Sequence, residues 1–324
     1  MSSSKKLIFT ICCNNYLAQA LTLGDSVKSN HPEVEFIIGL VDEPRNEIDY
    51  RYKVIPVKEA VESKALAHMS KNYDITELCT AVKPHYFEYF FKNSDAKQVI
   101  YLDPDIIVFS SLEELFRLSE NHSVIVTPHF CSPTGNGRFS GDIRVLSGGI
   151  YNLGFISISN HPNASMFLAW WKEKSLNEFY VNIEYFTDQL WANCVTCFCP
   201  DAYVLRHLGY NMANWNLHER YLSSRDGKFY VNDSIPLVFF HYSHYSPDRP
   251  HQMTSLDKSI LLSERPDIIP VYEVYRERLK QNNFDHYKTI KPVYFKKSVK
   301  ILPQFVRKFM VRVCVKTLLI LKHG

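Results

Sequence analysis

The sequence predicts an α/β fold in which a mixed, mostly parallel sheet is flanked by helices. Three observations support this prediction. Apolar runs with the length of buried strands alternate with segments of helical spacing. Their order, strand then helix then strand, is typical of parallel sheets with crossover helices. The 324 residues, 46% of them hydrophobic, are enough for one large domain with additions or for two smaller domains.

The expected elements follow one another along the chain. Residues 7–12 form a largely apolar run that predicts a buried first strand, and residues 17–29 show helical spacing. Further strands are expected over 34–41, 52–57, 99–102, 123–128, 150–158 and 236–242. Further helices are expected over 77–91, with a start or kink near Pro84, and over 110–118, 163–175 and 186–195.

Two carboxylates, Asp103 and Asp105, follow the apolar run 99–102. Because buried carboxylates are costly without a partner, we expect them where the strand emerges at the sheet edge. With one residue between them, both can face one ion, and Pro104 stiffens the backbone that presents them. Such paired oxygens suit Mg²⁺ or Mn²⁺, ions that hold nucleotide phosphates. Asp-Pro-Asp is also a good turn sequence, so the metal interpretation depends on the rest of the chain.

Cysteine usage limits the class of protein. Eight cysteines in a chain of this length do not make a disulfide scaffold, so we expect reduced thiols in the cytoplasm. Cys194, Cys197 and Cys199 form a cluster without the fourth ligand of a structural zinc site, which favours buried thiols over zinc. No segment approaches the roughly 20 apolar residues of a membrane span. The apolar stretch 7–13 is too short for a signal peptide.

The basic residues are concentrated at the C-terminus. Residues 291–324 contain nine of the 37 Lys and Arg residues and no acid, so the rest carries 28 basic and 34 acidic groups, a net charge of −6. Basic and apolar residues alternate over 296–322, the pattern of an amphipathic helix on an anionic membrane surface. The alternative is a C-terminal helix packed on the domain. Nucleic acid is not expected, because no recognition motif accompanies the charge.

Residues 131–149 are rich in Gly, Ser, Pro and Asn and are the best candidate for a mobile active-site loop. Residue Asn152 and residue Gly154 interrupt the apolar strand that follows, and a glycine within a strand often marks close approach of a ligand or another backbone. Further along, the strand 236–242 includes His241. Because ligands bind at the carboxyl ends of parallel strands, the loops at 13–16 and 103–105 are expected at the same edge.

An ordered set of motifs carries a family resemblance. The motifs are FTICCNNYLAQALTLGDSV, ELCTAVKP, YLDPDIIVFSSLEEL, GGIYNLGFISI, FTDQLWAN, GYNMANWNLHER and PLVFFHYSHY. Over about residues 5–250 the chain resembles GT-A glycosyltransferases, nearest to the retaining family 8 group that includes bacterial lipopolysaccharide glycosyltransferases and glycogenin. The ordered set is far more specific than any single motif. The resemblance implies a GT-A (Rossmann-like) catalytic domain over 1–250 and a C-terminal helical extension over 251–324.

The resemblance implies a metal centre. Asp103 and Asp105 would be the D-x-D ligands and His241 the third ligand, with histidine favouring Mn²⁺ over Mg²⁺. The metal would bridge the diphosphate of a nucleotide sugar, expected to be a UDP-sugar, and neutralise charge on the leaving nucleotide. The alternative for His241 is an ordinary histidine at a strand end.

Donor contacts are implied at two further places. The loop of Asn14, Asn15 and Tyr16 would contact the base and ribose, with Tyr16 either stacking on the base or merely starting a helix. Lys83 falls where the family places a basic residue near the donor phosphate and sugar. The alternative for Lys83 is a solvated helix lysine.

The resemblance also implies a sugar pocket. Asn152 and Gly154 would line it, and Asp188 and Gln189 match the family's Asp-Gln pair beside the donor sugar. A retaining reaction has two possible routes. The acceptor hydroxyl attacks the face that the leaving group departs from, or the reaction passes through a covalent intermediate. Gln189 is too weak a nucleophile to settle the choice between the two routes. Asp188 would stabilise positive charge at the anomeric carbon. If the enzyme inverts, Asp188 is a candidate general base.

On the acceptor side, the resemblance implies Asn211, Trp215 and Asn216, with Trp215 either a sugar-stacking platform or a core tryptophan. One departure concerns the grip on the diphosphate. The family typically has a glycine three residues after the late histidine and then a Lys-Pro pair. Here the glycine position is His244, no Lys-Pro follows, and Arg249 is the candidate replacement.

We therefore expect a metal-dependent, retaining hexosyltransferase that moves a sugar from a UDP-sugar to a saccharide or lipid-linked acceptor, at the inner face of the cytoplasmic membrane. One alternative is a sugar nucleotidyltransferase, which usually needs a Gly, Arg or Lys-rich phosphate loop, whereas residues 10–20 contain none of these. The other is a non-catalytic sugar- or membrane-binding protein on a GT-A scaffold.

Overall fold

The structure is a computed structural model that describes residues 6–134, 145–146, 148–177, 188–255, 261–295 and 313. Within these residues a seven-stranded sheet runs in the order β3-β2-β1-β4-β7-β6-β8. Its strands are β1 (Lys6–Cys12), β2 (Glu35–Leu40), β3 (Lys53–Pro56), β4 (Gln98–Leu102), β6 (Val124–Pro128), β7 (Tyr151–Ser159) and β8 (Tyr203–Val204).

The sheet is mixed and mostly parallel, as predicted. Strands β3, β2, β1 and β4 are mutually parallel, and β8 is parallel to β6. Strand β7 is antiparallel to both β4 and β6. Because β1 and β4 are parallel neighbours, the loops after Cys12 and Leu102 leave the same edge of the sheet.

A smaller sheet brings a distant strand to this edge. Strand β5 (Ile106–Val108) leaves the central sheet after the paired carboxylates and pairs antiparallel with β13 (Phe239–His241), which in turn pairs parallel with β9 (Met212–Ala213). The register places His241 opposite Ile106. A third sheet contains β10 (Leu222–Arg225), β11 (Lys228–Val231) and β12 (Ile235–Pro236).

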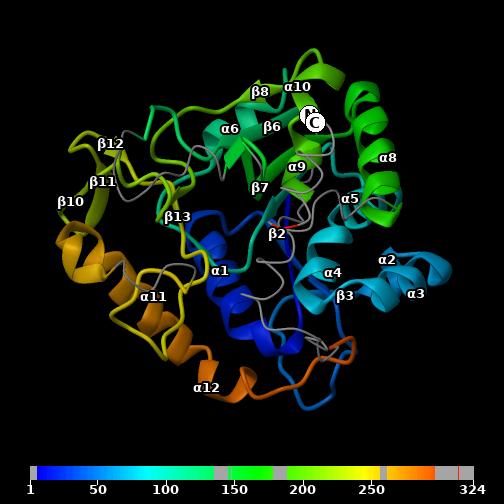
Figure 1. Ribbon diagram of the computed structural model, residues 1–324, viewed down its shortest axis with the longest axis horizontal. Coiled ribbons are helices and arrows are strands. Elements are labelled where there is room, and N and C mark those ends of the chain that lie inside the picture. Colours follow the sequence, from blue (N-terminus) through cyan, green and yellow to red (C-terminus); the bar gives the residue numbers. More distant parts are fainter. Residues whose placement is uncertain are drawn as a thin grey trace. The chain divides into compact units, whose positions relative to one another are not determined.

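Helices cover both faces of the central sheet. Helix α1 (Leu17–Asn30) lies beside α11 (Ile269–Gln281) and α12 (Phe284–Tyr287), as Figure 1 shows. Side chains alternate along β1, so that Ile8 joins one apolar core and Phe9 the other. The remaining helices are α2 (Val57–Ala60), α3 (Ser63–Asn72), α4 (Ile75–Ala81), α5 (Lys83–Asn93), α6 (Glu113–Leu118), α8 (Pro162–Asn177), α9 (Asp188–Ala192), α10 (Val195–Phe198), η1 (Asn14–Tyr16), η2 (Leu262–Glu264) and η3 (Pro266–Ile268).

The helix predicted over 77–91 is two helices that meet at Val82, so the predicted break near Pro84 is confirmed. Asp74 begins α4 with a capping box, in which its side chain accepts from the backbone of Glu77 and the Glu77 side chain accepts from the backbone of Asp74. Pro84 lies in the first turn of α5, where no backbone N–H is needed. The break places Lys83 at the start of α5.

The chain divides into two compact units, Met1–Tyr294 and Phe295–Gly324. Helices α11 and α12 belong to the first unit, although they lie beyond the boundary expected near residue 250; the division into a catalytic domain and an extension stays a prediction. Residues 296–312 and 314–324 of the basic tail, and most of the predicted loop 131–149, lie outside the described residues.

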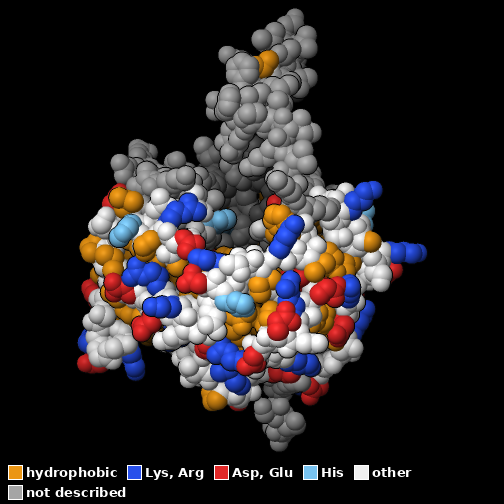
Figure 2. Space-filling model, turned by 90° about the horizontal axis from the view of Figure 1, so that it is seen from below, with side chains coloured by type: hydrophobic (Ala, Val, Ile, Leu, Met, Phe, Trp, Pro, Cys, Tyr) orange, Lys and Arg blue, Asp and Glu red, His pale blue; other side chains and the backbone are white. Residues whose placement is uncertain are grey.

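The surface of the described part of the chain is mixed in charge. Acidic and basic side chains are interspersed on the face shown in Figure 2. None of the helices in the described ranges is both long and apolar enough to cross a membrane.

Candidate active site

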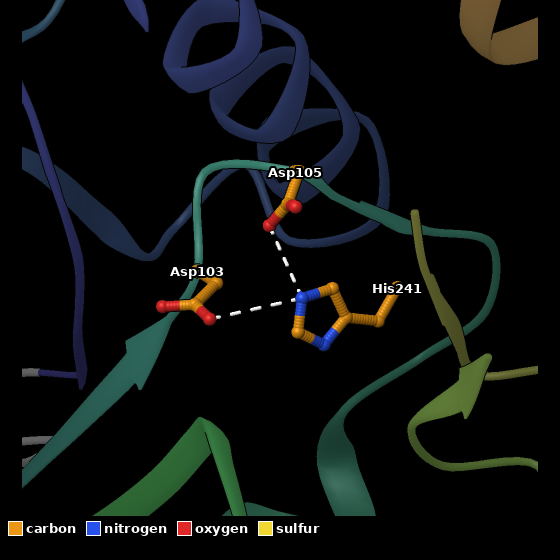
Figure 3. Close-up of side chains that lie close together, drawn as sticks. All are labelled: Asp103, Asp105 and His241. Atoms are coloured by element: carbon orange, nitrogen blue, oxygen red, sulfur yellow. Dashed lines mark ion pairs between the residues drawn. The ribbon is translucent and has the colours of Figure 1, made fainter. Parts of the chain in front are cut away.

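Asp103, Asp105 and His241 converge where β4 ends (Figure 3). His241 Nε2 lies 3.2 Å from Asp105 Oδ1 and 3.7 Å from Asp103 Oδ2. One ligand atom from each residue lies within 4.8 Å of the others, and no other group of three or more such side chains occurs among the described residues. Two carboxylate oxygens and one imidazole nitrogen form a donor set that can hold a divalent cation.

Backbone contacts hold this cluster in place. The Asp103 N–H donates to the Gly154 carbonyl oxygen on β7 (2.8 Å), and the Tyr242 N–H donates to the Asp105 carbonyl oxygen (2.8 Å). Burial disfavours the charged forms of Asp105 and His241, but their mutual attraction outweighs it. The pKa of Asp105 is therefore lowered and the pKa of His241 is raised.

Gly154 leaves the space that the His241 imidazole fills. A Cβ at this position would lie 2.4 Å from His241 Cε1 and 2.6 Å from Nδ1, distances that real contacts do not reach. The glycine that interrupts the apolar strand therefore has a packing reason: it lets a candidate metal ligand lie directly against β7.

We expect Gly154→Ala to displace the imidazole from Asp105 and lower Mn²⁺ affinity by about tenfold or more, because overpacking of this kind costs about 1–3 kcal/mol. The measurement is Mn²⁺ titration by calorimetry. Gly148→Ala is the matched control, because a Cβ there would meet no atom within 4 Å. Equal Mn²⁺ affinity in the two variants would contradict the role of Gly154.

Lys83 links the candidate metal ligands Asp103, Asp105 and His241 to Asp188. Its side chain is buried, its Nζ lies 2.8 Å from Asp188 Oδ2 and 3.5 Å from Asp103 Oδ1, and it donates to the Leu153 carbonyl oxygen (3.0 Å). The alternative of a solvated helix lysine is therefore wrong. The ammonium also lies over the Tyr101 ring, 4.5 Å from its centroid.

The pKa values of Lys83 and Asp188 are set by their burial and by the charges around them. Burial disfavours the Lys83 ammonium, but Asp103 and Asp188 outweigh it and raise the pKa of Lys83. Burial raises the pKa of Asp188, although Lys83 acts against this. The result is a buried ion pair beside the candidate metal ligands.

Asn152 and Gln189 belong to one hydrogen-bonded network. The Gln189 Oε1 accepts from Asn152 Nδ2 and from the Leu153 N–H, both at 3.1 Å. The Asn152 Oδ1 accepts from the Gly154 N–H (3.1 Å) and from Asn211 Nδ2 (3.0 Å). The Gln189 side-chain oxygen is thus already engaged by two donors within the protein.

Of the three predicted acceptor-side residues, Trp215 is the aromatic one, and it lies against the candidate metal ligand His241. Its half-buried ring makes T-shaped contacts with the rings of His241 (centroids 5.1 Å apart) and His129 (5.5 Å). Its Nε1 is buried and has no hydrogen-bond partner among the described residues. Asn216 is buried and donates to the carbonyl oxygens of His129 (3.0 Å) and Asn211 (2.9 Å). Asn216 therefore fixes the backbone at His129 and Asn211.

Two residues at the site were not predicted from the sequence. The Tyr101 hydroxyl donates to Asp103 Oδ1, and His129 Nε2 lies 3.3 Å from Asn152 Nδ2. Tyr101 precedes Asp103 by two residues, so strand periodicity places both on one face and could have indicated it. No motif in the sequence around His129 indicated that it would lie at the site. Burial lowers the pKa of His129 to about 4, so its imidazole is neutral.

The predicted nucleotide loop lies at the same sheet edge. Asn14 is buried, its Nδ2 donates to the Glu43 carbonyl oxygen (3.0 Å) and its Oδ1 accepts from the Tyr50 hydroxyl (2.7 Å). Asn15 and Tyr16 are half-buried. Burial, followed by the nearby charges of Asp105 and Asp103, raises the pKa of Tyr16. Asn14 therefore braces the loop.

The position where the family pattern has glycine is strained in this chain. His244 has φ of +57°, the left-handed region that favours glycine. Arg249, the candidate replacement for the missing lysine, is exposed. Among the clustered cysteines, Cys199 is buried as predicted, whereas Cys197 is exposed, so the prediction of buried thiols is wrong there.

Comparison with known proteins identifies the family. The family model described as glycosyl transferase family 8 matches residues 7–192, more than half of the chain. The chain belongs to glycosyltransferase family 8. The predictions of family, GT-A fold and enzyme class are confirmed, and the alternative of a sugar nucleotidyltransferase is wrong.

The proteins that this chain is similar to differ widely from it in sequence. The chain is 25% identical over 295 residues to the uncharacterized protein YfnF of Bacillus subtilis (strain 168), covering 88% of this chain and 95% of YfnF. Among solved structures it is similar to the glycosyltransferase GlyE of Streptococcus pneumoniae TIGR4, with a TM-score of 0.50, 16% identity, and coverage of 89% of this chain and 66% of GlyE. It is also similar to the galactosyltransferase LgtC, with a TM-score of 0.49, 18% identity, and coverage of 85% and 95%.

Proposed function

We propose that this family 8 glycosyltransferase transfers a hexosyl group from a UDP-sugar to a saccharide or glycolipid acceptor, depends on Mn²⁺ or Mg²⁺, and retains the anomeric configuration. The observation that supports this most is the meeting of Asp103, Asp105 and His241 beside the buried pair of Lys83 and Asp188. A charged leaving group and a developing positive charge on the sugar both need opposite charges nearby, and the site offers both signs.

Each residue of the site has a separate role in this proposal. Asp103, Asp105 and His241 would hold the cation, which when bound supplies neutralisation of the diphosphate leaving group. Asp188 would stabilise positive charge at the anomeric carbon, and Lys83 would keep Asp188 in place. Gln189 would orient Asn152 through the hydrogen bond to its side-chain oxygen. The departing phosphate oxygen would accept the proton of the acceptor hydroxyl.

The decisive test is calorimetry of UDP, GDP and dTDP binding with and without Mn²⁺. We expect UDP to bind only when Mn²⁺ is present. Mutation of a residue that only supports a metal ligand costs about 10- to 100-fold in affinity, so Asp105→Ala, which removes a ligand, should weaken UDP binding by more than that. Asp233→Ala, which changes an exposed carboxylate bonded to Tyr221, is the matched control. Absence of metal-dependent binding of all three nucleotides would contradict the proposed metal-dependent use of a nucleotide-sugar donor.

We also propose that the basic tail 296–322 binds an anionic membrane surface, where a lipid-linked acceptor would be found. The support is compositional: nine basic residues and no acid in 291–324. We expect the full chain to float with vesicles that contain anionic lipid and not with neutral vesicles. A variant truncated after residue 295 that floats equally well would contradict this.

A further inference from the structure

Asp42 is a buried carboxylate that the chemistry above does not use. It follows β2 and is 1% exposed. Its Oδ2 accepts from the Asn14 N–H (3.2 Å), and its Oδ1 accepts from the N–H groups of Glu43 and Val293, both at 3.0 Å. Three backbone donors satisfy this carboxylate, and they belong to three segments far apart in the sequence.

On one side, Asp42 is joined to the predicted nucleotide loop. Besides the Asn14 N–H bond to Asp42, the Asn14 side chain bonds the Glu43 carbonyl oxygen and the Tyr50 hydroxyl. Helix α12 packs against η1, the turn that contains this loop. The loop is therefore held by polar groups from the segment between β2 and β3 and by helix α12.

On the other side, Asp42 is joined to the segment that follows α12. Within this segment Pro292 is buried and Tyr294 packs on an apolar core cluster, so both neighbours of Val293 are anchored. The Val293 side chain itself is 55% exposed. The contribution of Val293 to this region is therefore its backbone N–H.

We propose that Asp42 is a positioning residue for donor binding, which fastens residues 292–294 to the loop 14–16 so that nucleotide affinity depends on the C-terminal segment. The inference rests on the proposed function, because that function assigns the nucleotide to this loop. Loss of the Val293 donor leaves Asp42 Oδ1 with a single partner, and the carboxylate that fixes the Asn14 backbone becomes free to move.

The test uses three variants of the full chain. Val293→Pro removes the backbone donor, and Val293→Ala is the matched control because it keeps the donor and alters only an exposed side chain. Asp42→Asn breaks the same link from the other side. Both carboxylate oxygens accept from backbone N–H groups, so the asparagine NH₂ would face a donor and could not form that bond. The measurements are UDP affinity with Mn²⁺ by calorimetry, hydrogen exchange of peptides covering residues 12–17, and kcat against KM for the donor.

We expect Val293→Pro to weaken UDP binding about tenfold, to raise donor KM with kcat unchanged, and to speed exchange over 12–17. Asp42→Asn is expected to do the same, and Val293→Ala to behave as wild type. If Val293→Pro and Asp42→Asn bind UDP with wild-type affinity, or if Val293→Ala loses as much affinity as Val293→Pro, this inference is overturned and the proposed function still stands. Weaker binding without faster exchange over 12–17 would also overturn it. Failure of the wild type to bind UDP would overturn the proposed function, and this inference with it.

Discussion

Asp188→Asn is expected to lower kcat by about 10²- to 10³-fold while leaving the fold and donor binding nearly unchanged. The carboxylate is 2% exposed, and asparagine matches its shape without its charge. Lys83 keeps a counter-charge in Asp103, whose Oδ1 lies 3.5 Å from the ammonium. The loss therefore reports the stabilisation of developing positive charge on the sugar. We expect it to match the loss of one preorganised oxyanion-hole donor, about 2.7–4 kcal/mol.

The measurement is the rate of UDP release from a UDP-sugar, at saturating donor and acceptor, with thermal unfolding to confirm the fold. Asp233→Asn is the control, since it makes the same chemical change at an exposed position. A kcat for Asp188→Asn within about threefold of wild type would show that the charge of Asp188 does not act on the transition state.

Lys83→Met is expected to destabilise the protein by about 3–5 kcal/mol, the usual cost of breaking a buried ion pair from one side. Methionine fills the same space, but Asp188 and Asp103 lose their shared counter-charge. Because burial already raises the pKa of Asp188, the unpaired carboxyl would take up a proton more readily in the folded than in the unfolded protein. Stability then falls as pH rises, so the loss should shrink as the pH is lowered toward the usual carboxyl range.

Urea unfolding of three variants tests this prediction. Lys172→Met is the matched control, because Lys172 pairs with Glu88 at 2.9 Å but both side chains are about one-third exposed (33% and 35%). A pair of that exposure contributes about 1 kcal/mol or less. Lys83→Met/Asp188→Leu should recover part of the stability lost in Lys83→Met. A cost for Lys83→Met no larger than that for Lys172→Met would contradict a buried, interdependent pair.

The local part of this site could be predicted from the sequence because its signals lie within a few residues. Asp103 and Asp105 follow an apolar run, and a polar loop follows the first strand; parallel pairing of β1 with β4 brings both to one edge. Pro84 indicated a break between two helices for a reason that is also local, the missing backbone N–H. The ordered motifs then identified the family.

Other features depended on contacts between distant segments. His241 reaches Asp105 only because β5 leaves the central sheet and pairs with β13, and a shift of that register by one residue would turn the imidazole away. Whether Lys83 was solvated or buried could not be read from its neighbours in sequence. Its burial follows from packing of α5 against the central sheet, where Leu153 and Asp188 meet it.

The sequence by itself determined the fold class, the family and the identity of the candidate metal ligands, because strand and helix periodicity and ordered motifs act over short distances along the chain. Only the tertiary structure decided how Lys83, Gln189 and Asp42 are partnered. Their partners are backbone groups and side chains on other elements, and a backbone N–H such as that of Val293 has no signature in a sequence, since every residue except proline carries one.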